Sequence, residues 1–437
     1  MMDETKQPAY LANQTYWALC DINAAYVSFC LLFNPQLRNK PLGVLSSNQG
    51  LVIARNTELK QLGVKMADPA FSAASLAKEH GGHLWGSNFT LFGDMSNRFH
   101  TELEYLLINP ERYSVDEAFG QLETRCMPDL NTYSKHIKQT IQQNLGLPVG
   151  IGVGRTRTLA KVANWASKEL KWQHKMQGVT VLDSLLKEAW LLARMPIGDV
   201  WGIGRKTAAK LDSLGIHTAL QLREADLKII QQQYGVTVER TLLELRGIEA
   251  ITLKDNRMAR EQICVSRTMG KLVTEQVILQ QALSSHVNHA AYKLRSQGSW
   301  CNKLVVFFNT NPFDTEKIQL RKSVDIHLPR PTQSTQVLTQ YADFLLSREF
   351  KAGYHYQKIG VVLAQLTDQP TPQGDLFSTA QDDNKEQINA AFDSINQKFG
   401  HGTIRLASEG NTQEWRPKDD LAPPSYTTDW DALPQAT

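Results

Sequence analysis

The sequence lacks the features by which a chain enters or crosses a membrane. No apolar run approaches the roughly 18 residues that a membrane helix needs. The first ten residues, MMDETKQPAY, are polar and acidic, unlike the basic start and apolar core of a signal peptide. We therefore expect a cytoplasmic protein. The apolar share of 42% and the charged share of 21% are typical of a globular chain rather than a disordered one.

Cysteine is scarce and scattered. The five cysteines form no Cys-x-x-Cys pair and have no nearby histidine partner; they are Cys20, Cys30, Cys126, Cys264 and Cys301. This pattern argues against both a zinc site and a disulfide framework. We expect all five to be small apolar residues of the interior.

The net charge is small but unevenly distributed. The chain of 437 residues carries +3 overall, and its length indicates about three or four domains. Residues 366–437 hold 5 basic and 12 acidic residues, a net of −7, so residues 1–365 carry +10. Within the latter, residues 257–330 hold 11 basic and 5 acidic residues, a net of +6. A basic body attracts a polyanion, and an acidic tail does not, although ordinary surface charge would give similar counts.

Three regions follow one another along the chain. Strands and helices alternate up to about residue 182, helices alone are expected at about 185–246, and strands dominate again at 264–365. In the first region we expect strands at 17–21, 41–46, 51–54, 112–123 (as a pair) and 149–153, and helices at 24–33, 56–62, 88–107, 129–145 and 158–170. In the third we expect strands at 264–269, 304–309, 323–327 and 358–365 and helices at 276–297 and 333–349, the order of a split α/β module.

Acidic residues stand at the ends of two predicted strands. Asp21 closes the first strand in CDINAAYVS, and Asp116 and Glu117 sit at the strand turn in YSVDEAF. A buried strand rarely ends in an unpaired carboxylate, because its desolvation is costly. Carboxylates from separate strands form sites for hard divalent cations such as Mg²⁺, which also takes phosphate oxygens of a substrate. Capping or salt-bridged acids would give the same spacing.

Basic residues follow a predicted strand-to-helix turn. Arg155 precedes the helix, and Arg157, Lys161 and Lys168 lie on it at spacings of four and seven, which places the last three on one helix face. Such a face suits phosphate groups. We assign Arg155, Arg157 and Lys161 to DNA; a solvated helix face is the alternative for any single one of them.

The segment VWGIGRKTAAKL predicts a helix-hairpin-helix. No glycine precedes Gly204 at the spacing of a phosphate-binding P-loop. Trp201, Gly202, Ile203 and Gly204 would form the hairpin, and backbone N–H groups at the start of the next helix, near Arg205, would hold a DNA phosphate.

Six segments resemble, in this order, the motifs of Y-family DNA polymerases: CDINAAYVS, VIARNTELKQLGVKM, DMSNR, YSVDEAF, GIGVGRTRTLAKVAN and DVWGIGRK. The resemblance covers about residues 16–430. It implies an α+β right-hand polymerase with a palm, small fingers, a helical thumb and a split α/β little-finger domain, followed by a flexible C-terminal tail. The activity it implies is error-prone, template-directed DNA synthesis opposite damaged bases, as in the SOS response.

The resemblance also implies domain boundaries. We expect an N-terminal extension at 1–15, a palm at 16–25 and 88–184, fingers at 26–87, a thumb at 185–250, a linker at 251–260, a little finger at 261–368 and a tail at 369–437.

Matching positions give roles to individual residues. By the resemblance, Asp21, Asp116 and Glu117 are the catalytic carboxylates that bind two Mg²⁺ ions, and the Ile22 carbonyl adds a ligand. The ions would activate a primer hydroxyl and stabilise the departing pyrophosphate.

Nucleotide selection is implied in the same way. Tyr26 matches an aromatic steric gate that excludes a ribose 2′-hydroxyl, a repulsive means of specificity. Lys60 and Lys168 match triphosphate contacts. The chain departs from the family at Ala25, where relatives often carry a second aromatic residue, and at Thr57, where many carry a phosphate-binding tyrosine.

The tail carries the sequence QGDLF, which resembles a sliding-clamp peptide. Gln373 begins it, and Leu376 and Phe377 would be its apolar anchors. The partners implied are primer-template DNA, deoxynucleoside triphosphates, the sliding clamp, a cleaved UmuD-like subunit and a RecA filament. The rest of the tail, with Trp415 near its middle, would hold the activating partners.

Three alternatives stay open. A nucleotidyl cyclase also uses two strand acids but would lack a helix-hairpin-helix and a basic module. A non-catalytic DNA-binding checkpoint factor would not need all three carboxylates. An independent bypass polymerase would need no accessory subunits.

Overall fold

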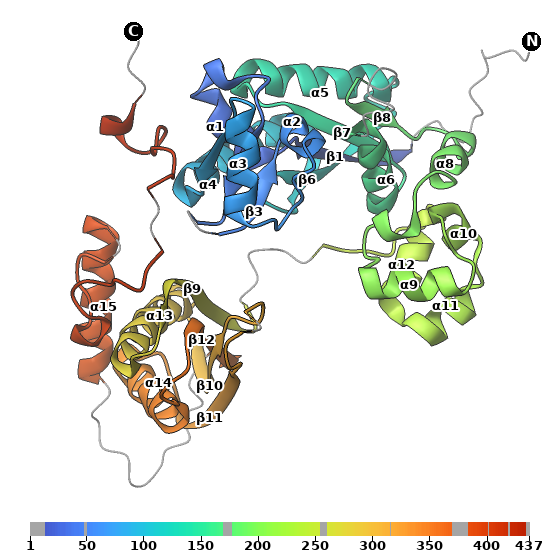
Figure 1. The fold of residues 1–437 in the computed structure, drawn as a ribbon. Helices are drawn as coiled ribbons and strands as arrows, with labels where there is room; N and C mark the ends of the chain where they lie inside the picture. Colours follow the sequence, from blue (N-terminus) through green and yellow to red (C-terminus); the bar gives the residue numbers. More distant parts are fainter. Residues whose placement is uncertain are drawn as a thin grey trace, which may run out of the picture. The chain divides into compact units, whose positions relative to one another are not determined.

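The computed structural model describes residues 14–47, 50–168, 177–253, 260–314, 316–368, 383–400, 402–417 and 420–433. The chain divides into two compact units (Figure 1). The first consists of Met1–Asn256 and Asp419–Thr437, and the second of Arg257–Lys418. Within the described residues, no helix has the length and apolar character required to span a bilayer.

A five-stranded sheet forms the centre of the first unit. Its order is β5-β6-β1-β7-β8, with β5 at Ile108–Arg112, β6 at Glu117–Glu123, β1 at Thr15–Ile22, β7 at Val149–Gly154 and β8 at Val179–Val181. The middle strand, β1, pairs antiparallel with both β6 and β7, and all its residues after the first are buried. Both faces of this strand are therefore covered, which explains its nearly continuous apolar sequence.

Helices cover the two faces of this sheet. Tyr16, Ala18 and Cys20 point into a core shared with α1 (Ala25–Leu32), α4 (Phe89–Leu106) and α5 (Leu130–Leu145). Trp17 and Leu19 point to the opposite face, which α6 (Arg157–Lys168) covers. Because side chains alternate along a strand, Asp21 lies on the α6 side.

A smaller sheet follows in the chain. It has the order β3-β2-β4, with β2 at Leu42–Leu45, β3 at Val52–Arg55 and β4 at His83–Gly86. Two short helices accompany it, α2 at Thr57–Gln61 and α3 at Ala70–Glu79. Together they bury a separate apolar core that includes Leu45, Leu59 and Leu84.

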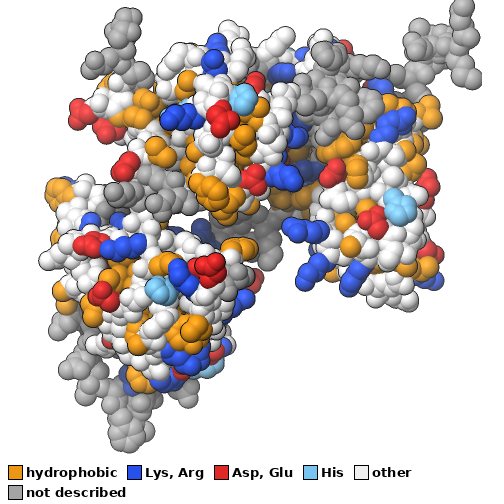
Figure 2. Space-filling model, viewed as in Figure 1, with side chains coloured by type: hydrophobic (Ala, Val, Ile, Leu, Met, Phe, Trp, Pro, Cys, Tyr) orange, Lys and Arg blue, Asp and Glu red, His pale blue; other side chains and the backbone are white. Residues whose placement is uncertain are grey.

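The expected helical stretch is present as five helices after β8. They are α8 (Leu185–Leu192), α9 (Arg205–Ser213), α10 (Ala219–Glu224), α11 (Leu227–Tyr234) and α12 (Val236–Leu245). They share a core with the apolar side of α6, through Leu159, Val162 and Ala166. In Figure 2, Lys and Arg side chains gather on the side of this helical region that carries α9.

The second unit is a split α/β module, as the sequence predicts. Its antiparallel sheet has the order β11-β10-β12-β9, with β9 at Ile263–Val273, β10 at Trp300–Thr310, β11 at Arg321–Thr332 and β12 at Tyr356–Thr367. Two helices, α13 (Gln276–Ser296) and α14 (Thr335–Glu349), pack together on one face of this sheet (Figure 1).

Much of the segment predicted to be a flexible tail is folded. Helix α15 spans Asp383–Phe399, and Asp393 in it accepts two hydrogen bonds from Arg295 of α13 at 2.6 and 2.8 Å. Residues 402–417 continue on the same unit, where the Trp415 carbonyl accepts from Gly270 N at 2.9 Å. Trp415 is only 1% exposed. Its side chain forms part of the core of the second unit, whereas the expected role of the surrounding tail in holding activating partners stays a prediction.

The last described segment, which we call the C-terminal strap (residues 420–433), returns to the first unit. Gly86 N donates to the Leu421 carbonyl at 2.7 Å, and Asn88 Nδ2 donates to the Pro423 carbonyl at 2.8 Å. Tyr426 stacks on Phe33 with ring centres 4.5 Å apart. The second unit is thus covalently connected to the first at both of its ends.

The prediction for the cysteines is confirmed for three of the five. Cys20, Cys30 and Cys301 are buried, whereas Cys126 and Cys264 are exposed, so the prediction is wrong for these two. Burial raises the pKa of the Cys20 and Cys30 thiols to about 12, so both stay protonated.

The strap contacts of Asn88 can be separated from its role as the N-cap of α4. Its Oδ1 accepts from Leu91 N at 3.0 Å, while its Nδ2 contacts the strap. Asn88→Asp keeps the capping acceptor and loses the donor, so we expect faster hydrogen exchange at Gly86 and residues 425–429 with α4 unchanged. Asn88→Ala should in addition destabilise the unit by about 1 kcal/mol. Unchanged exchange in Asn88→Asp would show that the strap is held elsewhere.

Candidate active site

The carboxylates predicted from the sequence meet at one edge of the central sheet. Asp21 at the end of β1 lies directly opposite Glu117 at the start of β6. Ile22 N donates to the Asp116 carbonyl at 2.9 Å, so the two strands stay paired up to this edge. Ser114, in the tight turn before β6, donates its hydroxyl to Asp116 Oδ1 at 2.6 Å and fixes that side chain.

One face of α6 supplies the counter-charges. Lys161 Nζ donates to both oxygens of Glu117, at 2.9 and 2.7 Å. Lys168 forms an ion pair with Asp21, and Asn164 Nδ2 donates to the same carboxylate at 2.9 Å. The sequence analysis missed Asn164, although its spacing of three from Lys161 and four from Lys168 puts it on the same helix face.

Burial makes this acidic edge energetically costly. Burial is the main reason that the pKa of Asp21 is raised to about 7, and the neighbouring Glu117 raises it further. Lys168 acts in the opposite direction but only partly offsets the burial. An additional positive charge near Asp21 would therefore stabilise the ionised form.

The donor set is suited to a hard cation. Three carboxylates and the Ile22 carbonyl offer only oxygen ligands, which Mg²⁺ prefers. Within the described ranges, no group of three or more acidic, histidine or cysteine side chains is arranged closely enough to hold a metal ion. Lys161 and Lys168 neutralise Glu117 and Asp21 instead. These residues fit the ions chemically, and binding would require the two ammonium groups to give up the carboxylates.

Tyr26 lies beside this edge, at the start of α1. Its ring stacks on Phe92 at 4.6 Å and meets the edge of Phe89 at 6.2 Å. Burial raises the pKa of its phenol, and the negative charge of Asp116 raises that pKa further. Ala24, the N-cap residue of α1, adopts φ 46°. This left-handed conformation is strained for alanine and often marks functional sites.

A cavity of about 560 Å³ adjoins the acidic edge. Four cationic side chains line it, and no acidic residue does; the four are Arg55, Lys60, Lys138 and Lys168. Lys168 therefore belongs to the cavity and to the Asp21 ion pair at once. Arg55 and Lys138 were missed by the sequence analysis. Arg55 sits within the VIARN segment and could have been noticed there, whereas Lys138 lies on α5 without any local signal.

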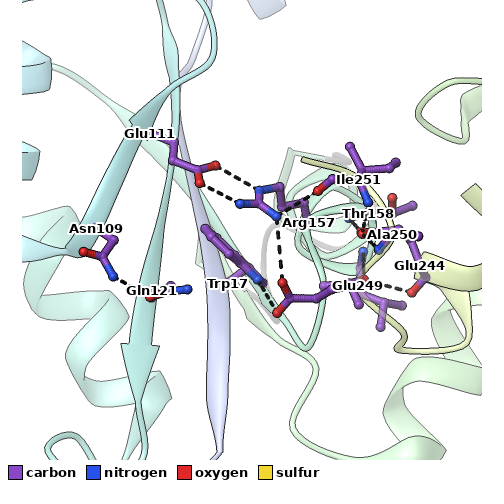
Figure 3. A network of polar contacts seen from close by, with 12 residues as sticks. Trp17, Asn109, Glu111, Gln121, Arg157, Thr158, Glu244, Glu249, Ala250 and Ile251 are labelled. Atoms are coloured by element: carbon purple, nitrogen blue, oxygen red, sulfur yellow. Dashed lines mark hydrogen bonds and ion pairs between the residues drawn. The ribbon is translucent and has the colours of Figure 1, made fainter. Parts of the chain in front are cut away.

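Arg157 contradicts its predicted role in DNA binding. It is 5% exposed, and its Nε and Nη2 donate to Glu111 at 2.9 and 2.6 Å. Its Nη1 donates to the Ile251 carbonyl at 2.9 Å, and its guanidinium lies 3.6 Å from the ring centre of Trp17 (Figure 3). These contacts engage all three nitrogens within the protein, so none faces a duplex.

The turn before α6 joins the sheet to the helical region. Arg155 donates twice to the buried Glu188 of α8, both at 2.8 Å. Glu244 of α12 accepts from Thr158 N at 3.0 Å and from the backbone of Ala250 and Ile251 (Figure 3). Arg155, which was assigned to DNA, therefore connects the sheet to the helical region.

The predicted hairpin has the expected backbone. Gly202 adopts φ 86°, which favours glycine, Ile203 is buried, and Gly204 precedes α9 as its N-cap. Gly204 and Arg205 are exposed at the helix start. Trp201, in contrast, donates its Nε1 to the Tyr113 hydroxyl at 3.0 Å, so its indole turns toward the sheet.

Aromatic rings enclose Lys161 between the hairpin and the acidic edge. Its Nζ lies 4.5 Å from the ring centre of Tyr113 and 5.7 Å from that of Trp201. Since it also binds Glu117, it connects the hairpin to the acidic edge and does not serve DNA in this arrangement. The predicted clamp residues Gln373, Leu376 and Phe377 lie outside the described residues.

Family models match most of the chain. The impB/mucB/samB family matches residues 20–165, the HHH motif of the IMS family residues 187–216, and the impB/mucB/samB family C-terminal domain residues 260–376. Residues 386–436 match a domain of unknown function, DUF4113.

Several curated proteins are similar over nearly their full length. Protein UmuC of Salmonella typhimurium is 38% identical, with 95% of this chain and 99% of that protein covered. Protein ImpB of Salmonella typhimurium is 36% identical, with 96% and 99% covered. DNA polymerase IV 1 of Bacillus subtilis is 26% identical, with 91% and 94% covered.

Solved structures share the fold. A Y-family DNA polymerase chimera aligns with a TM-score of 0.63 at 20% identity, covering 81% of this chain and all of that one. The insertion ternary complex of Dbh DNA polymerase aligns with a TM-score of 0.50 at 20% identity, covering 80% and 98%.

Because Arg157 is buried, we expect its substitution to lower the stability of the protein without changing its affinity for DNA. Arg157→Lys keeps the charge but loses the two-pronged contact with Glu111, so we expect urea unfolding to show a loss of about 1–3 kcal/mol. DNA affinity of the folded variant should not change. Arg205→Gln is the opposite case, with unchanged stability and a salt dependence of DNA binding reduced by about one unit of slope. A DNA-binding defect in folded Arg157→Lys would contradict the placement.

Proposed function

The chain belongs to the impB/mucB/samB family of Y-family DNA polymerases, and on this basis we propose that it copies damaged DNA by the chemistry of the acidic edge. It is a DNA-directed DNA polymerase of the error-prone, translesion kind. The observation that carries the assignment to these residues is the position of Lys168, which pairs with Asp21 of the acidic edge and also lines a cavity that holds three further cations and no acid. A nucleoside triphosphate needs both kinds of group side by side.

In the proposed reaction a primer 3′-hydroxyl attacks the α-phosphate of a deoxynucleoside triphosphate, and pyrophosphate leaves. Asp21, Asp116, Glu117 and the Ile22 carbonyl would hold two Mg²⁺ ions, which supply charge stabilisation and activate the hydroxyl. The cavity lysines Lys60 and Lys168, with Arg55 and Lys138, bind and orient the triphosphate.

Lys168 has two competing partners in this scheme. It pairs with Asp21 in the present arrangement, and it also lines the cavity. The highly charged triphosphate attracts its ammonium group more strongly than one carboxylate does. Nucleotide binding would thus draw Lys168 away and release Asp21 to bind a cation. Positioning and charge stabilisation contribute most of the catalysis in phosphoryl transfer.

We assign the central sheet with α4–α6 to the palm, the small sheet to the fingers, α8–α12 to the thumb and the module of β9–β12 to the little finger. Low fidelity follows from fingers this small, because they check the shape of a new base pair over little surface. DNA phosphates would contact the helix start at Gly204 and the basic second unit, contacts that carry no sequence information.

Further partners are proposed from the resemblance alone. The QGDLF segment would dock on a sliding clamp through Leu376 and Phe377 as an apolar pair. A cleaved UmuD-like subunit and a RecA filament would switch on synthesis, with the enzyme working in the cytoplasm.

Asp116→Asn should abolish most primer extension but leave DNA binding nearly intact. The charge at the acidic edge serves the chemistry, whereas duplex affinity arises from phosphate contacts elsewhere. A loss of several kcal/mol of transition-state stabilisation corresponds to a fall of about 100- to 1,000-fold or more in rate. Glu104→Gln, an exposed acid on α4, is the control. Near-normal extension by purified Asp116→Asn would refute the assignment.

Tyr26 should exclude ribonucleotides through its ring. We expect Tyr26→Ala to raise the incorporation efficiency of ribonucleotides relative to matched deoxynucleotides, because the wall against the 2′-hydroxyl is removed. Tyr26→Phe keeps the ring stacked on Phe92 and should stay close to the parent ratio. If Tyr26→Ala leaves the ratio unchanged, the tyrosine serves only in packing.

A further inference from the structure

A second cationic cavity lies within the second unit, between the little-finger module and the DUF4113 segment. Its volume is about 200 Å³, below the roughly 300–1,000 Å³ of pockets for drug-sized ligands, so it suits a small group. We call it the tail pocket. It is lined by residues of β9, α13, α15 and the segment 402–417.

Arginines from separate parts of the chain converge on the tail pocket. Arg267 comes from β9, and Arg405 and Arg416 come from the segment after α15; all three are exposed. His286 and His289 of α13 add two imidazoles. Arg405 donates its Nε to the Gly402 carbonyl at 3.0 Å, and within the described residues neither Arg405 nor Arg267 forms an ion pair.

The two acidic residues of the tail pocket are already engaged. Asp393 accepts from Arg295 with both oxygens, at 2.6 and 2.8 Å. Glu409 is 3% exposed and accepts from Asn288 Nδ2 at 2.8 Å. Arg295 compensates the charge of Asp393, and three arginines outnumber the one remaining carboxylate, that of Glu409, so the net charge of the pocket lining is positive.

Two residues that line the tail pocket carry buried polar atoms without hydrogen-bond partners among the described residues. Trp415 Nε1 and His286 Nε2 are both buried, and neither has a hydrogen-bond partner among the described residues. The two rings meet edge to face at 5.4 Å. Burial, followed by the charges of Arg267, Arg416 and His289, lowers the pKa of His286 to about 3, so the ring is neutral. Buried donors of this kind are rare in folded proteins unless water or a ligand satisfies them.

We propose that the tail pocket binds a phosphate group. Arginine presents a planar fork that matches phosphate, and a tetrahedral oxyanion can accept hydrogen bonds from several sides at once, as this arrangement requires. A carboxylate is planar and would be satisfied by one arginine. The phosphate can belong to a free small molecule, such as inorganic phosphate or pyrophosphate, or to the backbone of a DNA strand.

The docking of residues 402–417 creates this site. Gly270 N donates to the Trp415 carbonyl, and a side chain at Gly270 would meet the backbone of Arg416 at 2.8 Å. Ser408 and Ser284 share a hydrogen bond of 2.6 Å. The pocket thus gives the DUF4113 segment a binding role that is separate from the acidic edge of the first unit.

The test uses the full chain labelled with ¹⁵N-tryptophan, whose Trp415 indole resonance is assigned with Trp415→Phe. Titration with inorganic phosphate, and separately with pyrophosphate, should shift this resonance. Arg405→Gln should weaken the binding roughly tenfold, since one charge-assisted hydrogen bond is lost. Arg348→Gln, an exposed arginine of α14, is the matched control. Lys60→Gln should leave the response intact, which separates the tail pocket from the triphosphate cavity.

A second arm distinguishes the source of the phosphate. If DNA supplies it, Arg405→Gln and Arg267→Gln each lower DNA affinity and reduce its salt slope by about one, while Arg348→Gln does not. If a free phosphate compound is the ligand, DNA binding stays at the parent level and only the small-anion titration changes. A Trp415 resonance that neither anion nor DNA shifts, or that shifts equally in Arg405→Gln, overturns the proposal. These readouts do not depend on polymerase activity.

Discussion

The candidate site depends on ion pairs between the acidic edge of β1 and β6 and the basic face of α6. Asp21 and Glu117 come from neighbouring strands, and Lys168 and Lys161 compensate them one to one. Without these lysines, the buried carboxylate of Asp21 and the partly buried carboxylate of Glu117 would repel each other and resist ionisation. Lys168 also lines the adjoining cavity, so the ion pair that compensates Asp21 lies at the wall of that cavity.

The orientation of α6 in turn depends on the joint at its first turn. Arg157 connects Glu111 of β5 to Ile251 in the segment that follows α12. Glu244 of α12 binds the backbone of the same segment (Figure 3). A buried, fully engaged guanidinium holds its partners in one geometry, and removing it would leave Glu111 unpaired. The hairpin also contacts the site: Trp201 lies next to Lys161, and Lys161 binds Glu117. The helical region α8–α12 and the central sheet are thus connected at α6, the helix that carries the counter-charges.

Part of this arrangement was predictable from the sequence, for local reasons. Asp21 and Glu117 were identified because each stands at the end of a strand, and strand pairing then brings them together. Helical spacing correctly grouped Lys161 with Lys168. Arg157 shares that spacing, yet its partners Glu111 and Ile251 lie far away in the sequence, and no local pattern distinguishes a buried arginine from one that faces DNA.

The prediction for the C-terminal part was wrong in another way. Its polar composition was interpreted as the sign of a flexible tail, but much of it is folded. Trp415 is fully buried although most residues around it are polar, since α13 and β9 supply the apolar surface that the segment lacks. The strap then returns to the first unit through backbone carbonyls at Leu421 and Pro423, contacts that any sequence could make. The second unit is thus continuous in sequence with the first unit at both of its ends. Polar composition therefore does not distinguish a mobile tail from a segment that packs on an apolar surface supplied by other elements of the chain.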